Sequence, residues 1–302
     1  MHDQVITAAI EAFRRDDFDR ARSLIERGLA STEGQPLLHH LMGLIECRQG
    51  NFESGIGWLR RSLDLDPANV GYRIVLARAL TDGGRPREAL DITRGASMTA
   101  ELLHVRAEAA FAAGQRDIES VAWRELCKLK PSEPLVWMNF ARSLLAQSRF
   151  DEAAAAYREA ISLAPRKVAA FHELGLTLER TNRIADLATL LERALALGIP
   201  KEDLAEVWAM LELRRRRAHE AQRLLAHQPR GADQVRWNHL RARIYDAVGD
   251  AGAAFAAATA MNRSVRQYAN ARKVGAGYRA QLAALARTIT PEWGARLPRL
   301  TA

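Results

Sequence analysis

A pattern of apolar and small residues that recurs about every 34 residues constrains the fold of this chain most strongly. Its clearest copy spans residues 134–165, and its first half places one helical face at Trp137, Phe140, Ala141 and Leu144. The second half repeats this spacing at Ala153, Tyr157 and Ala160. Pro165 ends the second helix, because proline lacks a backbone N–H and restricts the residue before it. The segment therefore predicts a hairpin of two amphipathic helices.

The same template fits the chain eight times. The registers begin near residues 2, 36, 70, 100, 134, 168, 202 and 235, so the steps are 34, 34, 30, 34, 34, 34 and 33 residues. One hairpin cannot bury its apolar face alone, and a constant period therefore predicts a stack of similar units. The short step before residue 100 predicts a tighter connection over 95–99, with Thr99 as a helix N-cap.

Two units depart from the template in informative ways. In the second unit, Gly55 and Gly57 lie inside a predicted helix, although glycine there costs about 1 kcal/mol relative to alanine. Gly55 stands where the two helices should approach most closely, which explains why a glycine is tolerated. In the seventh unit, the run Arg214–Arg217 replaces the usual glycine turn.

The repeated motif resembles a known family. The spacing of its key positions is similar to the tetratricopeptide repeat, a 34-residue helix-turn-helix unit, at Trp137, Ala141, Ala153, Tyr157, Ala160 and Pro165. The resemblance implies an all-α right-handed superhelix (an α-solenoid) of about eight units. We expect the repeat array to cover residues 1–262, a C-terminal capping helix to cover 263–290, and a loosely ordered tail or linker to cover 291–302.

The charge and apolar patterns narrow the possible compartments and partners. The net charge is +8, but the arginines are spread along the chain among Asp and Glu, and Arg214–Arg217 form the one run. This distribution disfavours nucleic acid and leaves polyanion binding through arginines as a weaker alternative. No apolar segment approaches the ~20 residues of a membrane span, and no signal peptide is evident. We expect a cytoplasmic protein in which Cys47 and Cys127 are reduced thiols.

The sequence shows no arrangement that supports catalysis. It lacks a phosphate-binding glycine loop, a His-Glu-x-x-His metal motif and a Gly-x-Ser-x-Gly nucleophile motif. We therefore expect no enzymatic activity, cofactor or metal from this chain. The leading hypothesis is a non-catalytic scaffold for protein–protein interaction, with a peptide or partner protein in its concave groove.

In tetratricopeptide proteins the first helix of each unit lines that groove, at positions 2, 5, 9, 12 and 13 of the register. The resemblance gives these candidate groove residues: His40, Leu44, Arg78, His104, Glu108, Leu135, Met138, Arg142, Leu145, His172, Leu176, Glu179, His239 and Arg243. The mixture of histidine, arginine and apolar surface favours an acidic-apolar peptide or an intramolecular partner. Position 5 is histidine in four units. Three explanations stay open: the histidines contact a ligand in the groove, they sense pH, or they occur there by chance and take part in ordinary helix packing.

The C-terminal 40 residues carry a second resemblance. They are similar to the connector between the repeats and the catalytic domain of bacterial tetratricopeptide sulfotransferases, at Ala254–Phe255, Met261–Asn262, Tyr278–Ala280, Leu285 and Thr290–Trp293. The resemblance implies an alternative function, in which the chain is the N-terminal region of a sulfotransferase whose catalytic domain is missing from it. That domain would be an intramolecular partner, and no residue here inherits a catalytic role.

Overall fold

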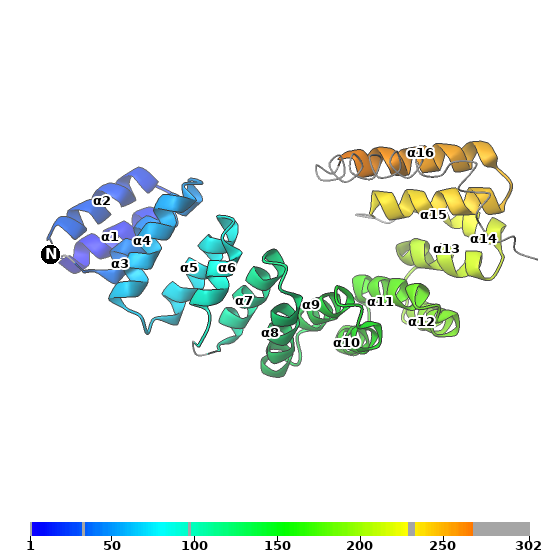
Figure 1. Ribbon diagram of the computed structural model, residues 1–302, viewed down its shortest axis with the longest axis horizontal. Coiled ribbons are helices and arrows are strands. Elements are labelled where there is room, and N and C mark those ends of the chain that lie inside the picture. Colours follow the sequence, from blue (N-terminus) through cyan, green and yellow to red (C-terminus); the bar gives the residue numbers. More distant parts are fainter. Residues whose placement is uncertain (1, 32–33, 96–97, 229–232, 268–302) are drawn as a thin grey trace, which may run out of the picture. The chain divides into compact units, whose positions relative to one another are not determined.

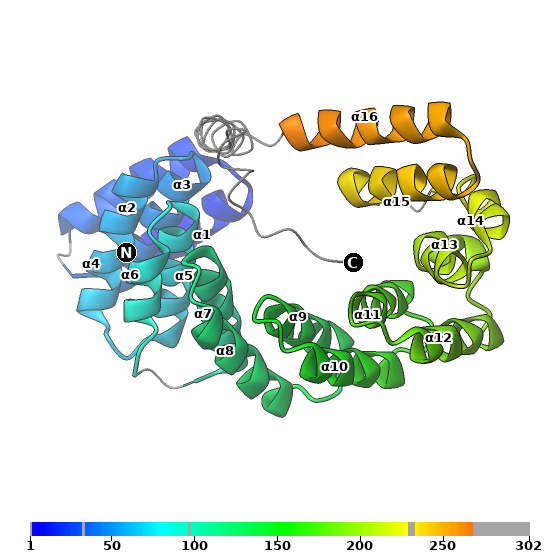
Figure 2. The same ribbon diagram turned by 45° about the vertical axis from the view of Figure 1, so that its right-hand side comes forward.

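The computed structural model describes residues 2–31, 34–95, 98–228 and 233–267, and every regular element in these ranges is a helix. The all-α prediction is confirmed. Successive α-helices form antiparallel hairpins, as α15 and α16 show in both views (Figure 1, Figure 2). Among the described helices, none combines the length and hydropathy that a membrane crossing requires.

The described helices form eight pairs. The first helices are α1 (His2–Arg14), α3 (Pro36–Arg48), α5 (Val70–Asp82), α7 (Ala100–Ala112), α9 (Pro134–Leu145), α11 (Val168–Arg180), α13 (Ala205–Arg214) and α15 (Gln234–Ala247). The second helices are α2 (Phe18–Ser31), α4 (Phe52–Leu65), α6 (Pro86–Ile92), α8 (Arg116–Leu129), α10 (Phe150–Leu163), α12 (Ile184–Ala196), α14 (Ala218–Leu224) and α16 (Ala251–Gln267). A short 3₁₀ helix, η1 (Lys201–Leu204), precedes α13.

The turn inside each pair has one residue in the left-handed region of backbone space. These residues are Asp16, Gly50, Gly84, Gly114, Ser148, Asn182, Arg216 and Gly249. Their separations are 34, 34, 30, 34, 34, 34 and 33 residues, the same steps as the sequence registers. Glycine adopts this conformation without strain, whereas other residues pay roughly 1–2 kcal/mol. The arginine run of the seventh unit therefore places Arg216, at φ 60°, where a glycine would fit best.

The predicted close approach at Gly55 is confirmed. A Cβ atom on Gly55 in α4 would lie 2.4 Å from the sulfur of Cys47 and 2.9 Å from the carbonyl oxygen of Gly43, both in α3. A Cβ atom on Gly57 would meet nothing within 4 Å. The two glycines of this helix thus differ, because one is required by packing and the other is not.

The short step before the fourth unit is accommodated in α6. This helix has seven residues, whereas α4 before it and α8 after it each have fourteen. Its last carbonyl groups receive hydrogen bonds from neighbouring helices, since Arg73 donates to the Ile92 carbonyl oxygen (2.9 Å) and Arg106 to that of Leu90 (3.2 Å). Thr99 caps α7 by accepting from the backbone N–H of Leu102 at 3.2 Å, as predicted.

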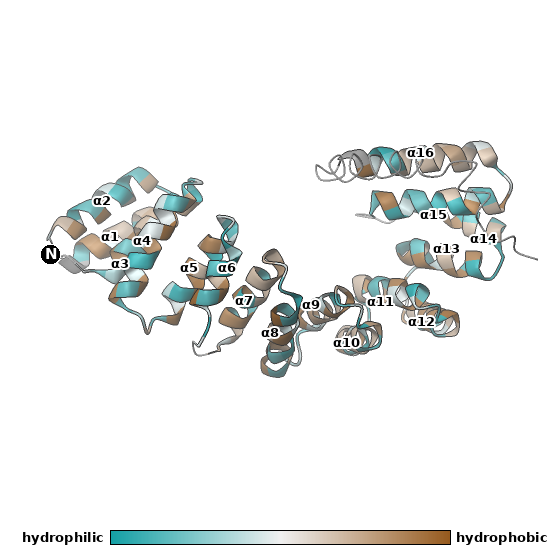
Figure 3. Cartoon of the chain, in the orientation of Figure 1, coloured by the Kyte–Doolittle hydropathy of each residue, from teal (hydrophilic) through white to brown (hydrophobic). Residues whose placement is uncertain are grey.

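The chain divides into two compact units, residues 1–170 and 171–302. In each compact unit the buried residues are mainly apolar, and Figure 3 shows hydrophobic and hydrophilic residues interspersed along the helices. In the first unit the largest buried side chains include Ile25, Met42 and Tyr157. In the second unit they include Phe171 and Trp237.

Helix α16 runs unbroken from Ala251 to Gln267 and so passes the expected end of the repeat array at residue 262. Residues 268–302 lie outside the described residues. They hold most of the expected capping helix, the expected tail, and the larger part of the resemblance to the sulfotransferase connector. Those three expectations stay predictions.

Candidate functional site

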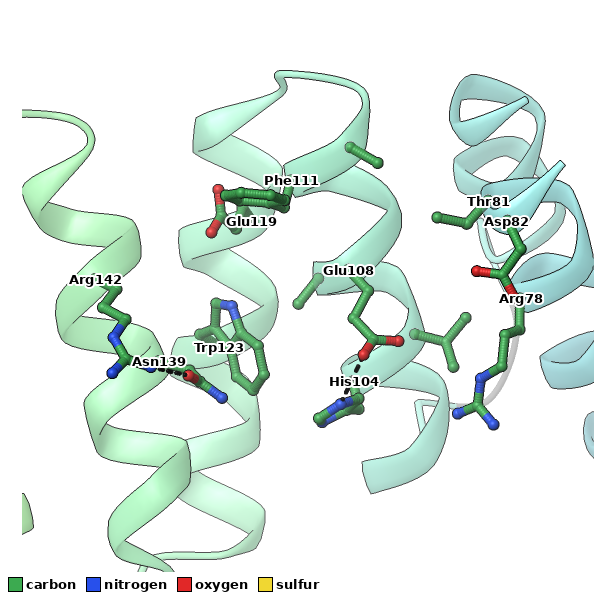
Figure 4. Close-up of a pocket in the computed structure, with 13 residues that line it drawn as sticks. Arg78, Thr81, Asp82, His104, Glu108, Phe111, Glu119, Trp123, Asn139 and Arg142 are labelled. Carbon is green, nitrogen blue, oxygen red and sulfur yellow. Dashed lines mark hydrogen bonds and ion pairs between the residues drawn. The ribbon is translucent and has the colours of Figure 1, made fainter. Parts of the chain in front are cut away.

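The first compact unit, residues 1–170, contains a cleft of about 520 Å³ (Figure 4). The cleft lies on the side of the first helices of the pairs. Four helices contribute its lining side chains: Arg78, Thr81 and Asp82 from α5, His104, Val105, Ala107, Glu108, Phe111 and Ala112 from α7, Glu119 and Trp123 from α8, and Asn139 and Arg142 from α9. Three successive first helices form the cleft, and α8 contributes side chains between α7 and α9.

The middle of the cleft is aromatic. The Phe111 side chain is 60% exposed, although the guanidinium of Arg116 lies 4.6 Å from its ring centroid. Trp123 is 6% exposed and makes an edge-on contact with the His104 ring, with centroids 5.2 Å apart. This surface can bury an apolar side chain of a ligand, which is the strongest general contribution to protein binding.

Charged groups lie at both ends of the aromatic surface. Figure 4 shows Arg78 and Arg142 on opposite sides of His104 and Glu108. The Nε2 atom of His104 lies 3.2 Å from a carboxylate oxygen of Glu108, and Arg142 donates to the Oδ1 atom of Asn139 at 3.3 Å. Arg78 is exposed and makes no hydrogen bond or ion pair with any described residue. Its guanidinium is therefore available to a ligand.

The Glu119 carboxylate is also in the cleft but is already neutralised. Its side chain is 7% exposed and pairs with Arg116 at 2.8 Å. No group of three or more His, Cys, Asp or Glu is arranged to hold a metal ion within the part of the chain that the structure describes. The cleft is thus a mixed aromatic and charged surface.

A protein-family model described as tetratricopeptide repeat matches residues 6–70 and 138–201. Over these two stretches the chain is similar to tetratricopeptide repeats. These two stretches cover most of the first, second, fifth and sixth helical pairs.

The chain is 32% identical over 117 residues to the BBSome complex member BBS4 homolog of Drosophila melanogaster. The aligned stretch covers 36% of this chain and 24% of that protein. It therefore spans about a quarter of the length of that curated relative.

Two solved structures are similar in fold. A tetratricopeptide repeat protein from Parabacteroides merdae matches with a TM-score of 0.51 at 14% identity, over 80% of this chain and 98% of that one. The structure of the APC/C hetero-tetramer Cut9-Hcn1 contains a chain that matches with a TM-score of 0.50 at 16% identity, over 85% of this chain and 52% of that one. At these identities the likeness concerns the fold alone.

The cleft brings together four of the predicted groove residues of the tetratricopeptide array: Arg78, His104, Glu108 and Arg142. The prediction missed Phe111 and Trp123, which form its aromatic surface. Phe111 is position 12 of its register, and position 12 is one of the five groove positions of the first helix. The register therefore contains the signal for Phe111. Trp123 belongs to a second helix, and a rule based on first helices could not find it.

Other predicted groove residues lie outside this cleft. Leu135 is 58% exposed, whereas Leu44 and Leu145 are half-buried. The prediction for Met138 is wrong, because its side chain is 1% exposed and cannot be offered to a partner. Met138 occupies position 5, and other position-5 side chains also contact neighbouring helices of the array.

His40, in the first compact unit, is a position-5 residue that contacts a neighbouring helix. Its ring packs against Tyr72 of the next first helix, with centroids 4.7 Å apart, and its buried Nδ1 atom has no hydrogen-bond partner among the described residues. Burial lowers the pKa of His40 to about 4. The side chain is therefore neutral at pH 7 and serves packing between repeats.

His172 has a related role in the second unit. Its Nε2 atom lies 2.8 Å from the carboxylate of Glu206 in α13. The Glu206 side chain is fully buried. Arg236 of α15 donates from Nε to the same carboxylate at 2.5 Å. Burial favours a raised pKa for Glu206, but the hydrogen bonds from His172 and Arg236 outweigh it and lower the pKa. This carboxylate thus joins three successive first helices.

The remaining predicted groove residues belong to the second compact unit. Leu176 is half-buried, and His239 and Arg243 are exposed. Glu179 accepts two hydrogen bonds from Arg214, at 2.8 and 2.6 Å.

The arginine run of the seventh unit is largely paired internally. Besides the bond from Arg214 to Glu179, Arg215 and Arg217 lie 3.6 and 3.7 Å from the carboxylate of Glu212, which is 7% exposed. Three of the four guanidiniums therefore have intramolecular carboxylate partners. This pairing weakens the hypothesis of a polyanion site at the run.

Proposed function

We propose that this chain is a non-catalytic scaffold that binds a segment of a partner protein in the cleft of α5, α7, α8 and α9. The observation that carries the proposal is the exposed ring of Phe111, in a cleft that the largely buried Trp123 also lines and that the guanidiniums of Arg78 and Arg142 flank. Tetratricopeptide repeats typically serve protein–protein interaction, which supports the same general class of function.

The chemistry of the cleft favours an acidic-apolar peptide. An apolar side chain of the peptide would pack on Phe111, and carboxylates on either side of it would receive hydrogen bonds from Arg78 and Arg142. Such charge-assisted bonds are stronger than those between neutral groups, and a guanidinium matches a carboxylate in geometry. The acidic groups Asp82 and Glu108 within the cleft would set the register by repelling carboxylates placed elsewhere.

Reversing both cleft arginines tests the proposal. Peptides of twelve random residues, displayed on phage, are selected on the full chain and measured by fluorescence anisotropy. We expect acidic-apolar peptides whose affinity falls at least tenfold in the double variant Arg78→Glu/Arg142→Glu, since tenfold corresponds to about 1.4 kcal/mol. Both side chains are exposed, so far-UV circular dichroism of the variant should match wild type.

The matched control is Arg158→Glu, which reverses an exposed arginine on α10, outside the cleft, and should leave affinity unchanged. Selected peptides that bind the double variant as tightly as wild type would reject the cleft as the binding site. An equal loss in the control would show that the effect comes from net charge alone.

A further inference from the structure

A second cleft, of about 320 Å³, lies in the first unit between α4 and α6. Its floor is apolar and is formed by Leu63 of α4, Leu76 of α5 and Ile92 of α6. The cause is the shortened helix α6, which ends at Ile92 after seven residues beside a fourteen-residue α4. The C-terminal half of α4 therefore lacks the neighbour that a full-length α6 would provide.

Part of the charged rim of this second cleft is satisfied internally. Arg60 of α4 and Arg85 both bind the carboxylate of Glu88, with Arg85 donating at 2.6 and 2.9 Å. Arg85 also pairs with Glu53 at 3.3 Å, so two guanidiniums and two carboxylates balance in charge and are poor candidates for ligand recognition.

Two further carboxylates on the rim are available. Asp64 of α4 is exposed and makes no hydrogen bond or ion pair with any described residue. Asp91 of α6 pairs with Arg94 at 3.1 Å, but both side chains are largely exposed, 67% and 75% respectively. Exposed pairs of this kind contribute little, so a ligand can compete for Asp91. The second cleft thus combines an apolar floor with two accessible negative charges.

We propose that the second cleft binds a basic-apolar segment of a partner protein, with a lysine or arginine side chain across its floor. The methylene groups of that side chain would cover Leu63 and Ile92, and its charged end would lie at Asp64 and Asp91. Lysine and arginine bury their aliphatic stems in this way while keeping the charge near water. Acidic ligands are disfavoured, because the two carboxylates would repel them.

This inference does not depend on the proposed function. The second cleft involves the second helices α4 and α6, whereas the first cleft is lined mainly by the first helices α5, α7 and α9. The two sites also require peptides of opposite charge. One chain could therefore hold an acidic segment and a basic segment at the same time.

The test uses the same library of random 12-residue displayed peptides, selected on the full chain and counter-selected on Asp64→Lys/Asp91→Lys. We expect the retained peptides to carry lysine or arginine next to apolar residues. Their dissociation constants, measured by fluorescence anisotropy, should rise roughly tenfold in Asp64→Asn/Asp91→Asn. They should stay unchanged in Arg78→Glu/Arg142→Glu, which alters only the first cleft.

The Asp→Asn variant keeps the shape of both side chains, so its circular dichroism and urea midpoint should match wild type. The proposal is overturned if no basic-apolar peptide is retained, or if retained peptides bind the Asn variant as tightly as wild type. It is also overturned if their binding depends on Arg78 and Arg142. Loss of acidic-peptide binding at the first cleft leaves this inference intact, which separates the two proposals.

Discussion

At the scale of single residues, the turn position shows how local geometry outweighs residue type. Gly50 and Arg216 occupy equivalent turns with φ of 84° and 60°, although arginine rarely adopts this conformation. The strain at Arg216 is roughly 1–2 kcal/mol. It is tolerated because the surrounding helices of the seventh unit bury enough apolar surface to impose the turn.

The two glycines of α4 give a matched prediction about packing. Gly57→Ala should stabilise the protein by about 1 kcal/mol, since alanine favours the helix and its Cβ meets nothing. Gly55→Ala should destabilise it by about 1–3 kcal/mol, because its Cβ would overlap Cys47 and Gly43. Urea denaturation followed by circular dichroism measures both. Shifts of the urea midpoint in the same direction for the two variants would contradict the packing seen at Gly55.

Among elements, α6 shows how a deletion is absorbed. The chain loses four residues of the repeat, yet the first helices α5 and α7 still pack side by side. The guanidiniums of Arg73 and Arg106 bind carbonyl groups that a longer α6 would satisfy internally. Burial lowers the pKa of Arg106, and the nearby charge of Arg94 lowers it further. A partly buried arginine is accepted there because it donates to two groups at the end of α6, the Leu90 carbonyl and the Thr93 hydroxyl.

Replacing Arg106 tests this cap. Arg106→Met keeps an apolar stem but removes the hydrogen bonds to the Leu90 carbonyl and to the Thr93 hydroxyl, which lies at 2.9 Å. We expect a loss of about 1–3 kcal/mol in the free energy of unfolding and weaker amide protection in α6. The control Arg87→Met replaces an exposed arginine of α6 and should change stability by less than about 0.5 kcal/mol. Equal stability of the two variants would argue against the cap.

At the scale of the whole molecule, the two compact units use their first helices differently. In the first unit they form a cleft with an available arginine, Arg78. In the second unit, charged side chains on the first helices pair with one another, as Glu206 does with His172 and Arg236. These charges of the second compact unit therefore hold its first helices together.

The Glu206 network predicts a pH dependence of stability. The pKa of Glu206 is lowered in the folded protein. Its charged form therefore adds to the free energy of unfolding at pH values above the unfolded-state pKa of about 4.3. It is lost as the pH falls below that value through the folded pKa. Glu206→Gln should destabilise the protein by about 3 kcal/mol at pH 7, since Arg236 then loses its carboxylate partner. The gap between variant and wild type should narrow at pH 3.

Thermal and urea unfolding at the two pH values measure this effect. The control Glu220→Gln removes an exposed carboxylate that pairs with Arg223, and it should cost less than about 1 kcal/mol at either pH. A gap for Glu206→Gln that stays constant with pH would contradict the assignment. The same network predicts that His172→Asp would destabilise the protein, because it would place a second carboxylate beside Glu206.

The groove residues show where a register rule stops. The resemblance to tetratricopeptide proteins predicts Arg78, His104 and Arg142 as groove residues, and the cleft contains all three. Met138 and His40 are also predicted groove residues, at position 5 of their registers. Their side chains are instead packed against other residues of the array. A register specifies the direction in which a side chain leaves its helix, whereas its exposure depends on the size and position of the residues opposite.

The sequence by itself determined the period, the helical hairpins, the positions of the turns and the need for glycine at residue 55. These follow from local sterics and from apolar spacing, which act between residues close in the chain. Only the tertiary structure decided which charges pair, which histidines are buried, and where clefts form beside α6 and α7. Those features depend on contacts between residues some 20–35 positions apart, such as Arg214 with Glu179, and on the space that a shortened helix leaves.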